Sequence, residues 1–233
     1  MEAIHKINST ELAENLNQKG YAIVSSFLSD EECDNLKDLY NSPSIYRKTV
    51  VMERHRFGLG EYKYFNYPLP NVLQYIRQSF YPQLSSVANL WMKVLNISTV
   101  FPPTLEELHK QCNENNQVKP TVLILKYGAG GYNTLHQDLY GDVYFPMQVV
   151  LFLSEPNKDY TGGEFVLTEQ VPRAQSKAIV LRPKKGDMLI FTTNFRPVKG
   201  TKGYYRVNMK HGVSEVTSGE RYALGIIFHD AIS

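Results

Sequence analysis

The sequence predicts an α+β protein in which an N-terminal helical layer packs against a C-terminal antiparallel β-sandwich or barrel. Before residue 120, apolar residues recur every three or four positions, as on the buried face of a helix. From Pro120 onward, short runs of β-branched and aromatic residues alternate with Gly, Pro and Asn, as in strands joined by turns. The composition, 42% hydrophobic and 21% charged over 233 residues, is that of a folded domain and disfavours disorder.

Residues 1–119 are expected to form the helical layer. Gly20 is placed to end a first helix, and Ser29 followed by Glu32 is the pattern of a capping box that starts a second. Pro82 is expected to break or kink the longest helical run, because proline lacks the backbone N–H. The expected helices are Thr10–Lys19, one starting after Ser29, the run from Val72 to Leu95, and Leu105–Cys112, with a short strand at Tyr21–Val24.

Residues 120–233 are expected to form the β domain, joined to the helical layer as one continuous structural unit. Gly128-Ala129-Gly130-Gly131 and Gly162-Gly163 mark turns between strands. Short strands at such spacing are typical of antiparallel sandwiches and barrels. The expected strands are Thr121–Tyr127, Met147–Leu153, Glu164–Thr168, Ala178–Leu181, Met188–Thr192, Tyr204–Met209 and Tyr222–Phe228.

The charge balance and the lack of long apolar runs narrow the class of protein. With 25 Lys and Arg against 23 Asp and Glu, the net charge of +2 argues against a histone-like or tail-driven nucleic-acid binder. No stretch approaches the roughly 18 to 20 apolar residues of a membrane span, and the start of the chain lacks the apolar core of a secretory signal. We therefore expect a soluble cytoplasmic protein with no membrane partner, in which Cys33 and Cys112 are buried thiols.

Three residues of the β domain form a candidate metal site. In His136-Gln137-Asp138 the imidazole and the carboxylate are two positions apart, so on a strand they would share one face. His211 lies at the junction of two β runs, where antiparallel strands could return it beside this pair. Two histidines and one carboxylate are the facial triad of non-haem Fe(II) oxygenases, which leaves coordination positions open. The alternative is an incidental cluster of structural residues.

Further residues suggest what else such a site would bind. Arg221 stands at the start of the last apolar strand, and its planar guanidinium can hold the distal carboxylate of a dicarboxylic 2-oxo acid. Tyr127, ahead of His136, could add a phenolic hydrogen bond or pack its ring in the core. Arg206 and Asn208 could line the substrate side of the metal, or lie in solvent on an edge strand.

These motifs together resemble the Fe(II)/2-oxoglutarate-dependent dioxygenase superfamily. The β domain resembles the double-stranded β-helix of its prolyl-hydroxylase branch, in which Gly162-Gly163-Glu164-Phe165 and the run from Pro183 to Phe191 have counterparts. The stretches FGLGEYKYFNYPLP and GGEFVLTEQVPRAQS resemble a bacterial family of such oxygenases that is linked to the oxidation of damaged nucleic acid. The resemblance implies a jelly-roll or cupin-like core, with Fe(II), 2-oxoglutarate and O2 as cofactors.

The resemblance also implies a reaction, the hydroxylation of a C–H bond with release of succinate and carbon dioxide. The stretch from Leu125 to Asp138 resembles the AlkB-type nucleic-acid dealkylases, but these carry two arginines after the distal histidine, whereas here only Arg221 follows His211. We therefore expect a small metabolite, an amino acid or a protein side chain as substrate, ahead of nucleic acid. A non-catalytic cupin-like binding module is a further alternative.

The segment from Arg173 to Lys210 is the most basic part of the chain, with ten Lys or Arg residues against the single acid Asp187. Such a cluster could contact a polyanion, including nucleic acid. The alternative is that these side chains protect exposed edge strands from aggregation.

Overall fold

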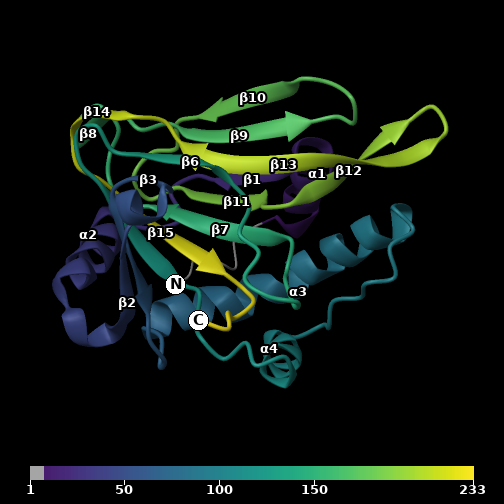
Figure 1. Cartoon of the computed structure of the whole chain (residues 1–233), viewed down its shortest axis with the longest axis horizontal. Helices are drawn as coiled ribbons and strands as arrows, with labels where there is room; N and C mark the ends of the chain where they lie inside the picture. The colour runs from purple at the N-terminus through teal and green to yellow at the C-terminus, as the bar shows by residue number, and fades with distance from the viewer. Residues whose placement is uncertain (1–7) are drawn as a thin grey trace.

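Two antiparallel β-sheets face each other, and helices cover the outer face of the larger sheet (Figure 1). The computed structural model describes residues 8–233. The helices are α1 (Ser9–Lys19), α2 (Asp30–Asp38), α3 (Asn71–Val94) and α4 (Leu105–Glu114), with short 3-10 helices η2 (Leu39–Asn41), η3 (Pro43–Ile45) and η4 (Met52–His55). None of the helices in this described part of the chain is long and apolar enough to cross a membrane.

The strands alternate in direction throughout both sheets. They are β1 (Tyr21–Val24), β2 (Tyr46–Val51), β3 (Gly58–Leu59), β4 (Glu61–Phe65), β5 (Leu123–Tyr127), β6 (Tyr132–His136), β7 (Met147–Phe152), β8 (Tyr160–Gly162), β9 (Phe165–Gln170), β10 (Ser176–Leu181), β11 (Met188–Thr192), β12 (Phe195–Gly200), β13 (Gly203–Val213), β14 (Val216–Gly219) and β15 (Arg221–Ile227). The larger sheet has the order β1-β11-β7-β15-β5-β4-β2. The smaller sheet has the order β10-β9-β13-β6-β3, with β12 paired to β13, while β14 and β8 form a separate pair. The predicted α+β class is confirmed.

The central strands of the larger sheet are buried on both faces. On β7, Met147, Val149 and Leu151 pack toward the helices, whereas Val150 and Phe152 pack between the sheets. This two-sided burial explains why β7, β11 and β15 appear in the sequence as almost continuous apolar runs. It also means that each polar residue on these strands lies either in the layer facing the helices or in the layer between the sheets, and both layers are buried.

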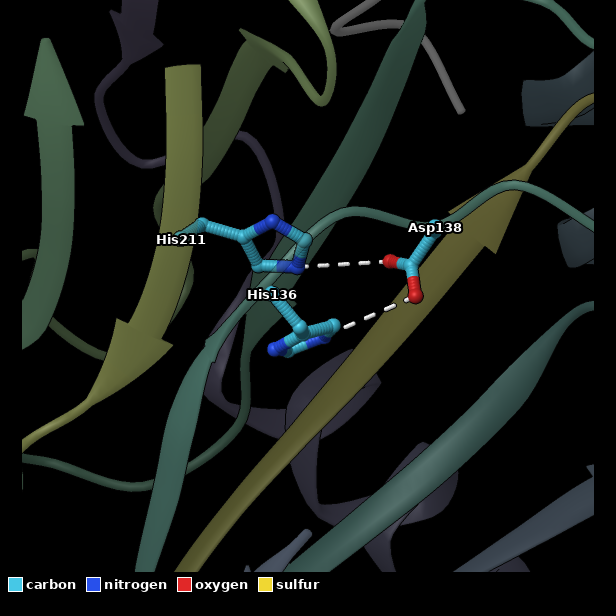
Figure 2. A group of neighbouring side chains, drawn as sticks. All are labelled: His136, Asp138 and His211. Atoms are coloured by element: carbon cyan, nitrogen blue, oxygen red, sulfur yellow. Dashed lines mark ion pairs between the residues drawn. The ribbon is translucent and has the colours of Figure 1, made fainter. Parts of the chain in front are cut away.

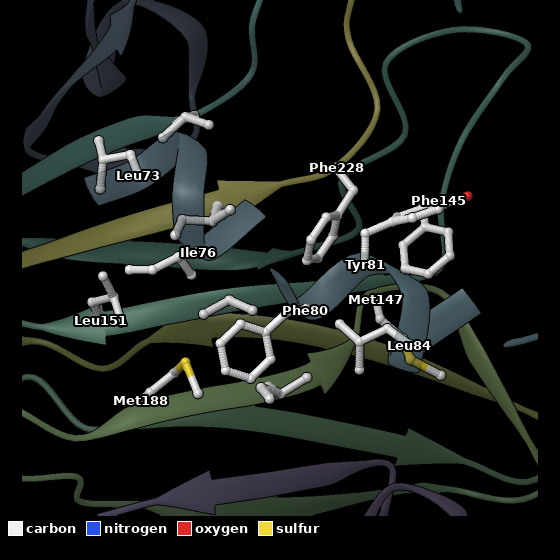
Figure 3. Packing of buried hydrophobic residues seen from close by; sticks show 14 of the residues in the cluster. Leu73, Ile76, Phe80, Tyr81, Leu84, Phe145, Met147, Leu151, Met188 and Phe228 are labelled. Carbon is white, nitrogen blue, oxygen red and sulfur yellow. The ribbon is translucent and has the colours of Figure 1, made fainter. Parts of the chain in front are cut away.

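Helix α3 closes the helix-facing core, where its Phe80 and Leu84 belong to one buried cluster with Leu151 and Met188 of the larger sheet (Figure 3). Of the two effects expected of Pro82, a break or a kink, the break is wrong, because α3 runs on through it. Burial of the apolar face on both sides of Pro82 offsets the backbone hydrogen bond that proline cannot donate.

The N-terminal part contributes more strands than the sequence predicted. Of its strands only β1 was expected, yet β2 and β4 extend the larger sheet and β3 extends the smaller one. Strand β4 pairs with β5, so that Tyr62 lies opposite Leu125, and β2 pairs with β4. These strands contain many Lys and Tyr residues and gain their stability from partners that are distant in the sequence. The alternation in Glu61–Phe65 was the available signal.

A buried ion pair fastens α3 to the end of β15. Arg77 is fully buried, and its Nη2 lies 2.8 Å from an Asp230 carboxylate oxygen. The same guanidinium donates to the backbone carbonyls of Ile227 and Phe228, at 3.0 and 2.7 Å. These bonds satisfy a charge that would otherwise be unpaired in an apolar layer.

We expect Asp230→Ala to lower the free energy of unfolding by about 3 to 5 kcal/mol, because it leaves the Arg77 charge buried without its partner. Urea denaturation followed by circular dichroism measures this change. The control is Asp142→Ala, which removes an exposed carboxylate and should change stability by less than about 0.5 kcal/mol. Equal stability of the two variants would contradict this account of the ion pair.

Candidate active site

The three predicted metal ligands meet between the sheets. His136 ends β6 and lies directly opposite His211 on β13. Asp138 follows two residues after β6 ends, held by a hydrogen bond from its backbone N–H to the Thr193 hydroxyl at 2.9 Å. Two expectations about the backbone are therefore wrong, since Asp138 lies beyond the strand and His211 lies inside one. The loop after β6, rather than strand parity, turns the carboxylate toward the imidazoles.

The geometry of this triad fits a single metal ion (Figure 2). Asp138 Oδ1 lies 3.5 Å from His136 Nε2, and Oδ2 lies 3.3 Å from His211 Nε2. One ligand atom from each residue lies within 4.8 Å of the others. His136 Nδ1 lies 2.7 Å from the Thr134 carbonyl oxygen, to which it must donate, so Nε2 keeps its lone pair for a metal. The donor set of two imidazoles and one carboxylate suits iron.

The protonation states of the triad also suit metal binding. Burial raises the pKa of Asp138, but the hydrogen bond and charge of His211 outweigh it and hold the pKa well below its usual value. Burial and then the charge of His136 lower the pKa of His211. At neutral pH the site therefore offers an ionised carboxylate and a neutral buried imidazole, the forms that bind metals.

Two residues that the sequence interpretation missed contact the triad. The Tyr140 hydroxyl donates to Asp138 Oδ1 at 2.7 Å. Burial, and then the Asp138 charge, raise the pKa of Tyr140 well above its usual value, so it stays a donor. Gln148 Nε2 lies 3.2 Å from His211 Nε2. The sequence feature that could have revealed Gln148 is that it is the single amide within the apolar strand Met147–Phe152.

Arg221 lies in the same cavity as the triad. This cavity, of about 220 Å³, is lined by all three candidate ligands and by Arg221 and Tyr127. Arg221 is only 2% exposed, and its Nε has no hydrogen-bond partner. Its guanidinium carbon lies 5.5 to 5.9 Å from the ring centres of Tyr127, Phe152 and Tyr160. Among residues 8–233 no carboxylate forms an ion pair with it, so this buried cation is set to receive an anion.

Tyr127 lies opposite Arg221 in the pairing of β5 with β15, and its side chain is fully buried. Burial raises the pKa of Tyr127 to about 12, so its hydroxyl is protonated at neutral pH. Asn133 Nδ2 donates to that hydroxyl oxygen at 3.3 Å and is a further cavity residue that the sequence interpretation missed. The phenolic hydrogen can therefore be donated to an anion beside Arg221.

Arg206 and Asn208 are not brought to the cavity. Both are exposed on β13, whose alternate residues Val207 and Met209 face the core with His211. The Arg206 guanidinium lies 5.1 Å from the centre of the Phe195 ring. Strand alternation thus places the two predicted substrate residues on the outer face of the smaller sheet.

The basic segment 173–210 is spread over several strands. Three of its cations form ion pairs with carboxylates of this chain. These pairs are Arg182 with Glu164, Lys185 with Asp34, and Arg196 with Glu169. The side chains of Lys199 and Lys202 are exposed, at the end of β12 and in the turn to β13.

The fold is that of the 2-oxoglutarate- and Fe(II)-dependent oxygenases, with a double-stranded β-helix core. A prolyl-4-hydroxylase of Pseudomonas putida matches 96% of this chain and 99% of its own at 13% identity, with a TM-score of 0.54. An oxidoreductase of the 2OG-Fe(II) oxygenase family from Burkholderia pseudomallei matches 97% of this chain and 94% of its own at 13% identity, with a TM-score of 0.55. A Trichoplax adhaerens prolyl hydroxylase, solved with a hypoxia-inducible-factor peptide, matches 98% and 91% at 18% identity, with a TM-score of 0.53.

The chain belongs to the Oxygenase-NA family, whose model matches residues 60–231 and is described as "oxygenase, catalysing oxidative methylation of damaged DNA". It is also 45% identical over 193 residues to two uncharacterised proteins of Mycobacterium tuberculosis, Rv2227 and MT2286, covering 81% of this chain and 83% of each relative. Both the expected superfamily and its enzymatic nature are confirmed. Fe(II), 2-oxoglutarate and O2 are the cofactors of this class.

We expect His211→Ala to lose stoichiometric binding of Fe(II), because two remaining ligands hold a first-row divalent ion too weakly. Anaerobic equilibrium dialysis of the purified protein measures the bound iron. His109→Gln is the matched control, since His109 lies outside the cavity and contacts the Phe228 carbonyl, and it should bind one iron. Full occupancy of the His211→Ala variant would rule out this metal site.

The Tyr140 hydroxyl should orient the Asp138 carboxylate for the metal. We expect Tyr140→Phe to raise the dissociation constant for Fe(II) about 10- to 100-fold, the usual effect of losing such a supporting hydrogen bond. Tyr132→Phe removes a hydroxyl from an exposed ring and should leave the constant unchanged. If the two variants bind iron equally well, Tyr140 has no role in orienting the ligand.

Proposed function

We propose that this chain is an Fe(II)- and 2-oxoglutarate-dependent dioxygenase in which His136, Asp138 and His211 hold the iron. Arg221 and Tyr127 hold the distal carboxylate of 2-oxoglutarate. The observation that carries the proposal is the buried Arg221 guanidinium, which has no carboxylate partner among residues 8–233 and shares one cavity with a triad of metal-ligand type. A dicarboxylic 2-oxo acid has the two features that such a cavity requires, a metal-binding end and an anionic end.

The residues of the cavity would each perform a distinct task. Bound iron would supply the oxidising chemistry by which 2-oxoglutarate, O2 and a C–H bond yield succinate, carbon dioxide and a C–OH group. Asp138 provides the negative ligand and Tyr140 fixes its orientation. Arg221 aligns the cosubstrate through charge-assisted hydrogen bonds. The apolar side chains of Leu125 and Val150 line the same cavity and exclude water.

We further propose damaged nucleic acid as the oxidised substrate, which the family description supports. The sequence had favoured a small metabolite, an amino acid or a protein side chain, because a second arginine is missing after His211. The small-substrate reading is kept as the alternative for the experiment below.

Succinate release from 2-oxoglutarate tests the proposed function. Wild-type protein with Fe(II) and air should release succinate slowly alone, and faster with one class in a panel of methylated oligonucleotides, peptides and amino acids. Stimulation by an oligonucleotide supports the proposed substrate, and stimulation by an amino acid or peptide supports the alternative. A protein that binds no iron and releases no succinate under any condition would contradict the dioxygenase proposal.

Substitution of Arg221 separates the cosubstrate from the metal. We expect Arg221→Ala to retain Fe(II) but to weaken 2-oxoglutarate binding by about 2 to 4 kcal/mol, the scale of a lost bidentate charged pair. Tyr127→Phe should cost about 1 kcal/mol, as for one hydrogen bond. Calorimetric titration measures both, with the exposed Arg182→Ala as control. Unchanged affinity of Arg221→Ala would show that another cation binds the carboxylate.

A further inference from the structure

Four consecutive exposed residues, Arg54-His55-Arg56-Phe57, span the end of η4 and the turn into β3; we call them the mouth loop. Phe57 lines the cavity and is 45% exposed. Its carbonyl oxygen accepts hydrogen bonds from the Thr134 N–H and hydroxyl, both at 2.9 Å. Thr134 is two residues before His136 on β6, so the mouth loop is attached to the strand that carries a metal ligand.

The backbone fixes the shape of the mouth loop. Arg56 adopts the left-handed conformation, with φ of 61°. Gly58 follows with φ of 139°, where a Cβ would come within 2.2 Å of the Tyr132 carbonyl oxygen. The neighbouring acid, Glu53, is turned to the backbone and accepts from the Gly60 N–H at 3.3 Å. Because the loop is held in one shape, a ligand that docks on it pays little ordering entropy.

The mouth loop presents two parallel rings to solvent. The His55 and Phe57 rings stack with their centres 5.3 Å apart and their planes inclined by 21°. Exposed flat rings of this kind are the platforms on which proteins stack unpaired bases, and each stacked base contributes about 1 to 3 kcal/mol.

Two cations are the sequence neighbours of the ring residues. Arg54 and Arg56 are exposed, and in the described part of the chain neither forms an ion pair. Guanidinium groups beside exposed aromatic rings are the combination that binds the backbone and bases of single strands. A base within a duplex could not reach the triad inside the cavity without leaving its stack, so the geometry favours an unpaired strand.

We propose that the mouth loop is the docking site for single-stranded nucleic acid, with Phe57 and His55 stacking a base and Arg54 and Arg56 binding phosphates beside the iron cavity. This rests on the proposed function, because it assumes nucleic acid as the substrate. It assigns the bound nucleic acid to the mouth loop. The basic segment 173–210 lies on other β-strands and is not part of this docking site.

Fluorescence anisotropy with a labelled single-stranded DNA 10-mer tests the docking site. The combined substitution Arg54→Gln and Arg56→Asn removes both charges, and asparagine tolerates the left-handed backbone at position 56. The slope of log K against log salt should become shallower by about 1.4, or 0.7 for each lost phosphate contact. Phe57→Ala should weaken binding about 5- to 150-fold with an unchanged slope, and Phe57→Trp should restore it.

The matched control removes two charges from the basic segment. Lys199→Gln with Lys202→Gln should leave the salt slope and the affinity unchanged, because these exposed lysines lie on the β12–β13 hairpin. A loss of binding in this variant, with no loss in the mouth-loop variants, would overturn the proposal. Equal affinity for an acidic peptide of the same charge would also overturn it, because stacking would then contribute nothing.

Failure of the docking proposal can be told apart from failure of the proposed function. Wild-type protein that releases succinate from 2-oxoglutarate but binds no oligonucleotide would overturn the docking site and leave the dioxygenase intact. Protein that neither binds iron nor releases succinate would remove the proposed function itself.

Discussion

The central strands of the larger sheet are buried on both faces, and the rest of the molecule depends on this constraint. Helix α3 covers one face, and the smaller sheet covers the other. A polar residue on these strands has no access to bulk water, so it must find a partner or lose free energy. Arg77 reaches Asp230 and backbone carbonyls at the helix-facing layer, which closes that layer. Arg221 is buried in the other layer without a carboxylate partner in the part of the chain that the structure describes. This difference indicates that ligands bind in the space between the sheets.

The same space receives residues from both sheets. His136 and His211 come from neighbouring strands of the smaller sheet, whereas Gln148 and Arg221 come from the larger one. Strand pairing thus sets the separation of the two imidazoles, and packing of the sheets sets the position of the cation relative to them. Tyr140, in the loop after β6, then orients the carboxylate. A cavity built in this way keeps its charged groups in place before any ligand enters, which lowers the cost of binding.

Sequence reasoning succeeded where one local signal was sufficient. The apolar runs of β7, β11 and β15 revealed their strands, because burial on both faces leaves few polar interruptions. The chemistry of two histidines, a carboxylate and an arginine suggested the site before its geometry was known. Properties set by distant pairing were not predictable, and so β2 and β4 were missed and the choice between cavity and solvent stayed open for Arg206. Whether a side chain on β13 faces the cavity depends on register, which the sequence alone does not determine.

The central claim is that the triad and Arg221 act on the two ends of one cosubstrate. Calorimetric titration of the anaerobic protein with 2-oxoglutarate and with 2-oxopentanoate, which lacks the distal carboxylate, tests it most directly. With Fe(II) present, 2-oxoglutarate should bind at least about 30-fold more tightly, since about 2 kcal/mol comes from the charged pair with Arg221. Both ligands should bind far more weakly when the metal is omitted. Equal affinities for the two acids, or 2-oxoglutarate binding that is indifferent to the metal, would contradict the claim.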